Sequence, residues 1–308
     1  MHVVIGAGAV GTATARQLVK ERSESVRLIT RSGSGPRLPG IELVAADATD
    51  PARLTRLTTG ATAIYNCANP RYHRWPTDWP PLAAALLAAA EASGAPLVIA
   101  GNLYGYGPVD RPMTEDQPLL PTTVKGKVRV RMWQDALAAH RAGRIRVTEV
   151  RASDFISPRH SLLEQAVPAM RAGRTVWLPV PLDVPHSFSY TGDLARTMIV
   201  AATTERSWGR AWHVPSAPAL TVRELLVRAA QLGGFAPPVL RRFPALVVRT
   251  AGLVNPFVRE FLEMRYQYER PYLLDATATR AALGVDPTPL DDALRATLEQ
   301  FAPAGSRV

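Results

Sequence analysis

The chain has 308 residues, 47% of them apolar and 20% charged, and is long enough for a domain of about 150 residues plus a smaller one. No run approaches the ~20 uncharged apolar residues of a membrane span, and the apolar N-terminus lacks the basic segment of a targeting signal. The single cysteine, Cys67, excludes an internal disulfide and a cysteine-rich metal site. We therefore expect a soluble, cytoplasmic protein that holds no metal.

The formal net charge of +10 would suit a polyanionic partner. The basic residues are scattered and almost all arginine, without the interleaved aromatic residues that line a groove for a nucleic-acid strand. We therefore expect no nucleic-acid partner and no membrane. An acidic, phosphate-bearing small molecule accounts for part of the positive charge.

Short apolar runs alternate with helical patterns through the first half of the chain. Strands are predicted at HVVI, VRLIT, IELVAA, ATAIYNC, PLVIAG and IRVTEVR. Helices are predicted at residues 10–21, 51–58 and 122–142, and in the alanine-rich PPLAAALLAAAEAS. Because strands without polar alternation are buried on both faces, the pattern predicts a parallel sheet covered by helices on each side. The fold class is therefore α/β, a Rossmann-type doubly wound parallel sheet.

Beyond about Arg151 this alternation ends. Helix-like LLEQAVPAMRAG and TVRELLVRAAQLGG are mixed with proline-rich LPVPLDVPH and with a basic, apolar segment, FPALVVRTAGLVNPFVREFLEM. We expect residues 1–150 to form the cofactor-binding core. Residues 151–308 would form mainly a smaller substrate-binding lobe, with some segments returning to the core and a ligand cleft between the two. The C-terminal APAGSRV, residues 302–308, is predicted to be a disordered tail.

A glycine motif follows the first predicted strand. Gly6, Gly8 and Gly11 have the spacing G-x-G-x-x-G, with Ala9 and Val10 opening the helix. Glycine at these places permits a tight turn, lets the backbone approach a pyrophosphate and lets the helix pack on the strand. The free N–H groups at the helix start attract the anion. The motif predicts a dinucleotide site.

The end of the second predicted strand decides which dinucleotide is preferred. A carboxylate there would hold the ribose 2′-hydroxyl of NAD(H), whereas arginine would pair with the 2′-phosphate of NADP(H). The chain has LITRSGSGPR, with Arg31, Ser32 and Arg37 and no acidic residue. NADP(H) is therefore favoured over NAD(H).

Six further segments carry a family resemblance, in the family's order along nearly the whole chain. They are VAADATD, YNCAN, IAGNLYGYGP, EVRASDFISPR, HSFSYTGDLARTM and WHVPSAPALTVREL. Together they resemble an extended short-chain dehydrogenase/reductase, the superfamily of nucleotide-sugar epimerases and dehydratases. The resemblance implies that further cofactor contacts come from Asp47, Ala48, Cys67, Ala68, Asn69, Ala152 and Ser153. Cys67 itself has no neighbour that would activate a thiolate, so we expect a small packing residue.

The chemistry of that superfamily uses a tyrosine that passes a proton, a lysine four residues later and a serine or threonine. In this chain the serine place falls on Ala100, and the tyrosine and lysine places fall on Lys125 and Arg129. No tyrosine of the chain has a lysine four residues later. The resemblance is therefore to an atypical member whose catalytic residues do not transfer directly.

Three interpretations of this gap stay open. Lys125 could replace the tyrosine if Arg129 and burial push it toward the neutral amine, or it could stay charged and bind the ribose or the phosphates. Tyr104 or Tyr106 could supply the phenol, with Asn102 polarising the substrate oxygen. In the third interpretation catalysis is lost, and the protein senses NADP(H) for a protein partner.

The loop NPRYHRWPTDWPP argues against loss of catalysis alone. Its aromatic side chains would wall a pocket for a flat or apolar molecule at the carboxyl edge of the sheet, where loops carry sites. The residues predicted to contact substrate are Tyr72, His73, Trp75, Tyr104, Tyr106, Arg159 and Tyr190.

These observations lead to one function and one alternative. We predict an NADP(H)-dependent reductase or isomerase/epimerase of secondary metabolism that acts on a small carbonyl or enone compound, with Lys125 as first and Tyr104 as second candidate for the proton carrier. The alternative is a non-catalytic NADP(H) sensor that binds a protein partner. The all-round apolar PPLAAALLAAAEAS could also pair with a second copy, which predicts a homodimer.

Overall fold

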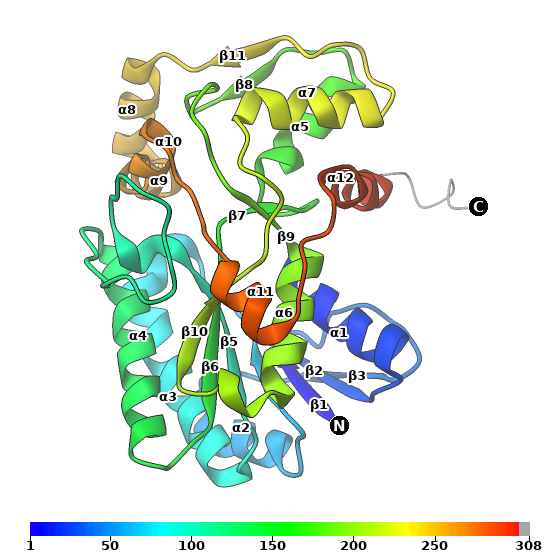
Figure 1. Ribbon diagram of the computed structural model, residues 1–308, viewed down its shortest axis with the longest axis vertical. Coiled ribbons are helices and arrows are strands. Elements are labelled where there is room, and N and C mark those ends of the chain that lie inside the picture. The colour runs from blue at the N-terminus through cyan, green and yellow to red at the C-terminus, as the bar shows by residue number, and fades with distance from the viewer. Residues whose placement is uncertain (302–308) are drawn as a thin grey trace.

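The computed structural model describes residues 1–301, and the predicted tail, residues 302–308, lies outside the described residues. A seven-stranded sheet with the order β10-β6-β5-β4-β1-β2-β3 forms the lower half of the molecule (Figure 1). All its neighbouring strands are parallel. The strands are β1 (His2–Ile5), β2 (Val26–Thr30), β3 (Ile41–Ala45), β4 (Ile64–Asn66), β5 (Leu97–Asn102), β6 (Val147–Ala152) and β10 (Arg210–His213). The predicted α/β fold class is confirmed.

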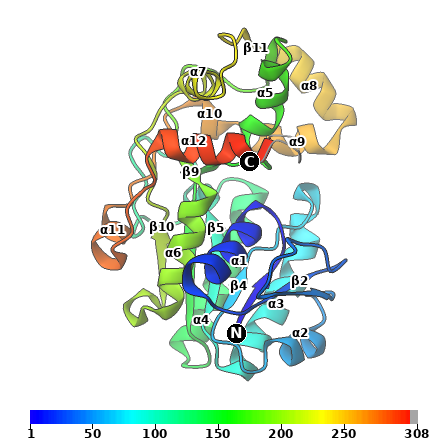
Figure 2. The same ribbon diagram turned by 90° about the vertical axis from the view of Figure 1, so that its right-hand side faces the viewer.

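The central strands are buried on both faces. In β1, Val3 and Ile5 join the core formed with α2 (Pro51–Thr58), α3 (Trp75–Ser93) and α4 (Val124–Arg141). Val4 joins the core formed with α1 (Ala9–Arg22) and α6 (Thr191–Thr203). Figure 2 shows α1 and α6 on one side of the sheet and α2 and α3 on the other. This double burial explains why the strands read as uninterrupted apolar runs.

Most helices lie within a few residues of their predicted bounds. The helices of this half are α1 (Ala9–Arg22), α2, α3 (Trp75–Ser93), α4 (Val124–Arg141) and α6 (Thr191–Thr203). The exception is α3, because the sequence predicts a loop up to Pro81 and the helix begins at Trp75. Trp75 and Trp79 lie one turn apart and are both buried, and this burial offsets the backbone hydrogen bonds that Pro80 and Pro81 remove.

The strand order reverses beside β1, since β2 and β3 lie to one side and β4, β5, β6 and β10 to the other. In open parallel sheets, ligands bind outside the carboxyl ends of the strands at such a point. The strand β10 and helix α6 come from the second half of the chain and complete this layer.

Most of the remaining elements form a second lobe above the carboxyl edge of the sheet, whereas α11 (Thr277–Leu283) packs beside α6 and β10 (Figure 1). They include two small parallel pairs, β7 with β9 and β8 with β11. Their bounds are β7 (Asp154–Ile156), α5 (Leu162–Arg171), β8 (Val176–Leu178), β9 (Phe188–Tyr190), α7 (Val222–Leu232), β11 (Leu240–Arg242), α8 (Ala245–Val254), α9 (Pro256–Glu263), α10 (Tyr266–Glu269), α11 (Thr277–Leu283) and α12 (Leu290–Leu298). Within residues 1–301, every helix is too short or too polar to traverse a lipid bilayer.

Candidate functional site

The turn between β1 and α1 has no room for side chains at two of its glycines. Gly6 has a φ of +96°, and a Cβ on it would lie 2.8 Å from the backbone of Ala68. A Cβ on Gly11 would lie 1.8 Å from the carbonyl oxygen of Gly6. A Cβ on Gly8, by contrast, has nothing within 4 Å. The turn therefore has no space for a side chain at Gly6 or Gly11, whereas the space next to Gly8 is open.

This open place fits the pyrophosphate of a dinucleotide. Gly8 is the N-cap of α1 and makes no side-chain cap, and the first turn carries no acidic residue. The helix therefore presents its positive end and free N–H groups to the space above Gly8. Ala9 and Val10 begin the helix, as predicted from the motif.

The residues expected to choose between the two dinucleotides lie in an exposed loop. Arg31, Ser32 and Arg37 follow β2 and are all exposed. Asp47, just after β3, accepts hydrogen bonds from the backbone and the hydroxyl of Thr49, which hold the pKa of its carboxyl below the ordinary value. The ends of β2 and β3 thus place an arginine and a carboxylate at the same edge of the sheet.

Two buried polar atoms at this edge have no hydrogen-bond partner within residues 1–301. They are Asn66 Nδ2, at the end of β4, and Ser153 Oγ, just after β6. Unpaired buried polar groups are costly, and a ligand in the cleft would satisfy them. This observation and the turn at Gly8 both fit a bound dinucleotide.

The other predicted cofactor residues lie near these atoms. Cys67 is buried, and burial raises the pKa of its thiol to about 12, as expected of a packing residue. Ala68 lies against Gly6, and Ala152 ends β6 opposite Asn102 of β5. Ala48 is half-buried after β3, and Asn69 is exposed after β4.

Two tyrosines from distant segments meet above the carboxyl ends of β4 and β5. The Tyr72 hydroxyl donates to the Tyr104 hydroxyl at 3.3 Å, and the Tyr104 ring stacks on Trp75 with centroids 6.0 Å apart. Burial raises the pKa of Tyr104 to about 12. The expected donor Asn102 instead accepts the backbone N–H of Tyr104 at its Oδ1. Tyr104 is therefore protonated at neutral pH and held rigidly.

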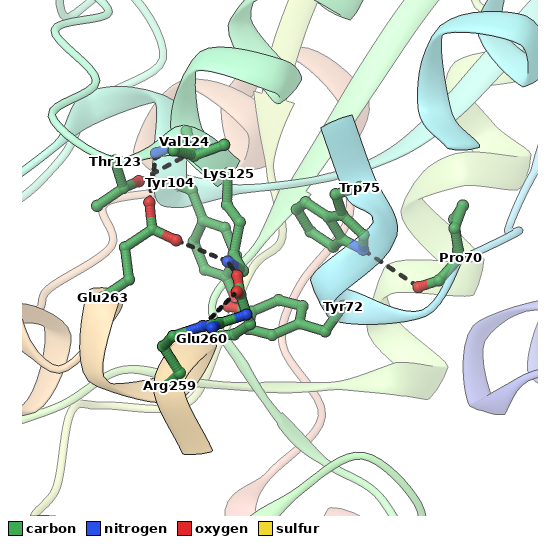
Figure 3. A network of polar contacts seen from close by, with 11 residues as sticks. Pro70, Tyr72, Trp75, Tyr104, Thr123, Val124, Lys125, Arg259, Glu260 and Glu263 are labelled. Carbon is green, nitrogen blue, oxygen red and sulfur yellow. Dashed lines mark hydrogen bonds and ion pairs between the residues drawn. The ribbon is translucent and has the colours of Figure 1, made fainter. Parts of the chain in front are cut away.

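Lys125 completes this cluster. It lies in the first turn of α4, its Nζ is 4.6 Å from the centre of the Tyr72 ring, and its side chain is only 2% exposed. Figure 3 shows the amine facing two carboxylates of α9. Nζ donates to Glu260 and, at 2.6 Å, to Glu263. Glu263 also accepts the backbone N–H of Val124, so it caps α4.

The expectation that Arg129 would press Lys125 toward the neutral amine does not fit this geometry. Arg129 is buried in the opposite direction, with its guanidinium 5.0 Å from the Trp75 ring and 4.6 Å from the Trp79 ring, and it donates to the carbonyl of Ala100 at 3.2 Å. The strongest local influence on Lys125 is the pair of carboxylates, to which it donates. The amine has to leave them before it acts as a base.

Two of the predicted pocket residues are core residues. Tyr106 is 1% exposed, and its hydroxyl lies 2.7 Å from His213 Nε2 and accepts from Arg151 at 2.8 Å. The structure contradicts the assignment of Tyr106 to a substrate-binding wall. Its hydroxyl instead belongs to a buried polar network with Arg151 of β6 and His213 of β10. Trp75 is 2% exposed and supports Tyr72 and Tyr104 from behind instead of facing the cleft.

The remaining predicted substrate residues lie apart from this cluster. His73 and Arg159 are exposed, and they follow β4 and β7. Tyr190 ends β9 and packs against Gly192. Within residues 1–301, no hydrogen bond or ring contact joins these three residues to Tyr104, and the structure does not bring them into the cluster.

Sequence reasoning missed four residues of the cluster. They are Glu260 and Glu263, which cover Lys125, and Asp154 with His186. The carboxylate of Asp154 lies 3.0 Å from His186 Nε2 and accepts from the Tyr268 hydroxyl. Burial acts to raise the pKa of Asp154, but His186 and Tyr268 hold it below the ordinary value. Asp154 was detectable, since it stands at the asparagine place of the motif in EVRASDFISPR.

A cavity of about 70 Å³ opens in the second lobe beside this cluster. Its lining includes Arg242, Arg249 and Arg265, with Phe243 and Phe261 as apolar walls. Tyr268, whose hydroxyl contacts Asp154, also lines it. Among the described residues, no three histidine, cysteine, aspartate or glutamate side chains gather closely enough to hold a metal ion.

The chain matches known proteins in sequence pattern and in fold. Residues 2–214 match the model of the NAD dependent epimerase/dehydratase family. No curated protein matches the chain by sequence. In fold it is similar to a UDP-N-acetylglucosamine 4-epimerase from Methanobrevibacter ruminantium (TM-score 0.80, 14% identity, 97% of each chain covered).

Two further solved structures are similar over almost the full length. A UDP-glucose 4-epimerase from Thermotoga maritima has a TM-score of 0.79 and 16% identity, with 98% of each chain covered. A dTDP-glucose 4,6-dehydratase from Streptomyces venezuelae, solved with NAD, has a TM-score of 0.74 and 20% identity, with 98% of this chain and 97% of that chain covered. At these identities the likeness is one of fold.

Proposed function

The chain belongs to the NAD dependent epimerase/dehydratase family, and we propose that it is an NADP(H)-dependent reductase or isomerase acting on a small carbonyl or enone compound. The observation that carries the proposal is the cluster of Tyr72, Tyr104 and Lys125 at the carboxyl edge of the sheet. A reacting oxygen placed there would meet proton donors on two sides. Fold alone does not set this function.

The cofactor would lie across the carboxyl ends of the strands. Gly6, Gly8 and Gly11 leave the space for its pyrophosphate, and the exposed Arg31 and Ser32 suit a 2′-phosphate. The bound nicotinamide supplies hydride transfer, and the protein supplies orientation and a proton. The absence of an acidic residue in the 31–37 loop supports NADP(H) over NAD(H).

The cluster offers the proton that reduction of a carbonyl requires. Reduction of a carbonyl delivers a hydride to its carbon and a proton to its oxygen, so the site needs a donor. The Tyr104 hydroxyl accepts the hydrogen bond from Tyr72, so the proton of Tyr104 is not used in that bond. The pKa of about 12 keeps this proton on Tyr104 at neutral pH, where it is available to a substrate oxygen. Lys125 donates in the same way once it leaves Glu260 and Glu263.

Two features describe the substrate. Tyr72 and Tyr104 offer aromatic surface, which suits a flat or apolar carbonyl compound. The cavity lined by Arg242, Arg249 and Arg265 suits an anionic group elsewhere on the same molecule. A nucleotide sugar, the substrate class named for the similar structures, is the competing class.

A sensor without catalysis is the second candidate function. The observation that favours it is the cover that Glu260 and Glu263 place on Lys125. If this cover is permanent, Lys125 cannot reach a substrate, and cofactor binding would be read out by a protein partner.

The two functions separate in one assay. Purified protein is titrated with NADPH and with NADH by nicotinamide fluorescence, and a panel of ketones, enones and nucleotide sugars is then added. An enzyme oxidises NADPH with at least one of them. Tight binding without turnover across the panel would support the sensor, and absence of binding would exclude both functions.

Lys125→Met tests the cluster, with Lys127→Met as its control. Lys127 lies two residues further along α4 and is exposed, so its loss leaves the site intact. We expect Lys125→Met to lower kcat about 10²-fold or more and Lys127→Met to leave it unchanged. Equal kcat values for the two variants would show that Lys125 is not the proton donor, and Tyr104 would then be the remaining candidate.

A homodimer in the cytoplasm completes the proposal. Leu82, Leu86 and Ala89 of α3 are buried within the protein's own helix layer, whereas Ala84 and Ala88 are exposed and small enough for close helix pairing. Light scattering on the purified protein, with Ala88→Glu as the variant, tests this state: a monomer before substitution would exclude it.

A further inference from the structure

The large exposed apolar side chains of the protein are concentrated in one place. Nine large apolar residues are strongly exposed among residues 1–301, and seven of them come from β8, β11 and α8 or the segments joining these elements. The seven are Trp177, Val239, Phe243, Leu246, Val247, Leu253 and Val254. Below, these seven residues are called the apical patch. An apolar patch of this size on a protein surface marks an interaction site.

The helix α8 turns its apolar stripe away from the protein. Leu246, Val247, Leu253 and Val254 recur at the spacing of one helical face and are between 50% and 86% exposed. The opposite face packs inward, where Gly252 lies against Leu262 of α9. The helix has a single charged residue, Arg249, which is exposed. Among the side chains that the structure describes, none covers this stripe.

Aromatic side chains extend the patch across the neighbouring strands. Trp177 is 46% exposed and stacks on Phe243 with ring centroids 5.3 Å apart. Trp177 is paired in register with Arg241. Tryptophan and phenylalanine beside basic residues are the composition of surfaces that lie at the boundary between lipid headgroups and acyl chains.

Basic side chains outnumber acidic ones around the patch, where Glu269 lines the cavity beside Phe243 and pairs with Arg265. Arg241, Arg242 and Arg249 are exposed, and Arg174 precedes β8. No aspartate or glutamate occurs between Glu224 and Glu260. A basic and apolar surface of this kind is complementary to an anionic bilayer. It is a poor match for a second copy, because a two-fold contact would set these arginines against each other.

The position of the patch suits a flat partner. The strands β8 and β11 lie at the end of the second lobe farthest from the sheet, with α8 on its outer flank (Figures 1 and 2). We propose that the apical patch docks the protein onto the surface of an anionic lipid bilayer, with α8 lying in the plane of the headgroups. This departs from the sequence-based expectation that the protein has no membrane partner.

Vesicle sedimentation with the full chain tests the proposal. Vesicles of phosphatidylcholine alone and of phosphatidylcholine with phosphatidylglycerol are mixed with the protein at low and high salt. We expect the bound fraction to rise at least tenfold with phosphatidylglycerol and to fall with salt, because the arginines are screened. A protein that stays in the supernatant with both vesicle types would overturn the proposal.

Matched variants assign the binding to the patch. Leu253→Glu with Val254→Glu should abolish sedimentation, whereas Leu120→Glu should not, since Leu120 is 70% exposed but lies outside the patch. Arg241→Gln should weaken binding to anionic vesicles, and Arg56→Gln, on exposed α2, should not. Circular dichroism confirms folding of each variant. If Leu253→Glu with Val254→Glu binds as the wild type does, or converts a dimer to a monomer without any vesicle binding, the patch is not a membrane surface.

Discussion

The turn at Gly8 and the cluster at Lys125 lie at the same edge of the sheet but are built differently. The turn is made of backbone, and its shape follows from a positive φ at Gly6 and from contact distances that exclude a Cβ at Gly11. The cluster is made of side chains from separate segments, with Tyr72, Lys125 and Glu260 brought together only by folding. The proposed cofactor binding thus depends on local geometry, and the proposed proton transfer depends on tertiary contacts.

The largest effect should come from a methyl group at Gly11. A Cβ there would overlap the Gly6 carbonyl, so Gly11→Ala should lower the free energy of unfolding by about 3 kcal/mol or more. Gly8→Ala should change it by less than about 0.5 kcal/mol, because its Cβ meets nothing within 4 Å and its φ of −68° is ordinary. Thermal unfolding measures both.

The same pair separates stability from cofactor binding. Gly8→Ala places a methyl group where the pyrophosphate is expected, so NADPH affinity should fall at least tenfold, about 1.4 kcal/mol. Unchanged affinity in a folded Gly8→Ala protein would show that the dinucleotide does not cross this turn.

Tyr104→Phe and Tyr106→Phe should affect different properties. Tyr104→Phe keeps the stack on Trp75 and removes the hydroxyl, so kcat should fall about 10²-fold or more with little change in stability. Tyr106→Phe removes one hydrogen bond from Arg151 and one from His213, which keep Glu149 and the Asp275 carbonyl as partners, and this should cost about 1–2 kcal/mol of stability. Steady-state kinetics measures kcat and urea unfolding measures stability for both variants. A loss of stability in Tyr104→Phe together with a loss of kcat in Tyr106→Phe would contradict this assignment.

The network around Tyr106 also predicts a pH dependence of stability. Burial lowers the pKa of His213 from 6.5 to about 4, so the unfolded chain takes up a proton before the folded one does. The contribution is present above pH 6.5 and is lost as pH falls toward 4, at most about 3 kcal/mol. His213→Gln should flatten this part of the unfolding profile. His73→Gln, at an exposed position, should leave the profile as it is.

The smallest effect is expected at the cofactor-selecting loop. Arg31→Ala removes an exposed cation after β2 and should weaken NADPH binding about tenfold, near 1.4 kcal/mol, while NADH binding changes little. Fluorescence titration with both nucleotides gives the ratio. Equal losses for NADPH and NADH would indicate that Arg31 does not read the 2′-phosphate.

The sequence by itself determined the sheet and the turn. The strand VRLIT is observed at Val26–Thr30 and the helix at residues 51–58 as α2, because apolar periodicity and Gly-Pro punctuation act over a few residues. The glycine spacing likewise fixed the shape of the β1–α1 turn. These features depend on neighbours in the chain, which a sequence displays directly.

Only the tertiary structure decided the surroundings of the side chains. Lys125 and Arg129 lie one turn apart on α4 but have different surroundings. Lys125 pairs with Glu260 and Glu263 of α9. Arg129 packs against the rings of Trp75 and Trp79. Tyr104 and Tyr106 are two residues apart, yet Tyr104 contacts Tyr72 and Trp75 while Tyr106 contacts Arg151 and His213. Burial and ion pairing depend on which distant segments pack against a residue, and a linear pattern contains no record of those contacts.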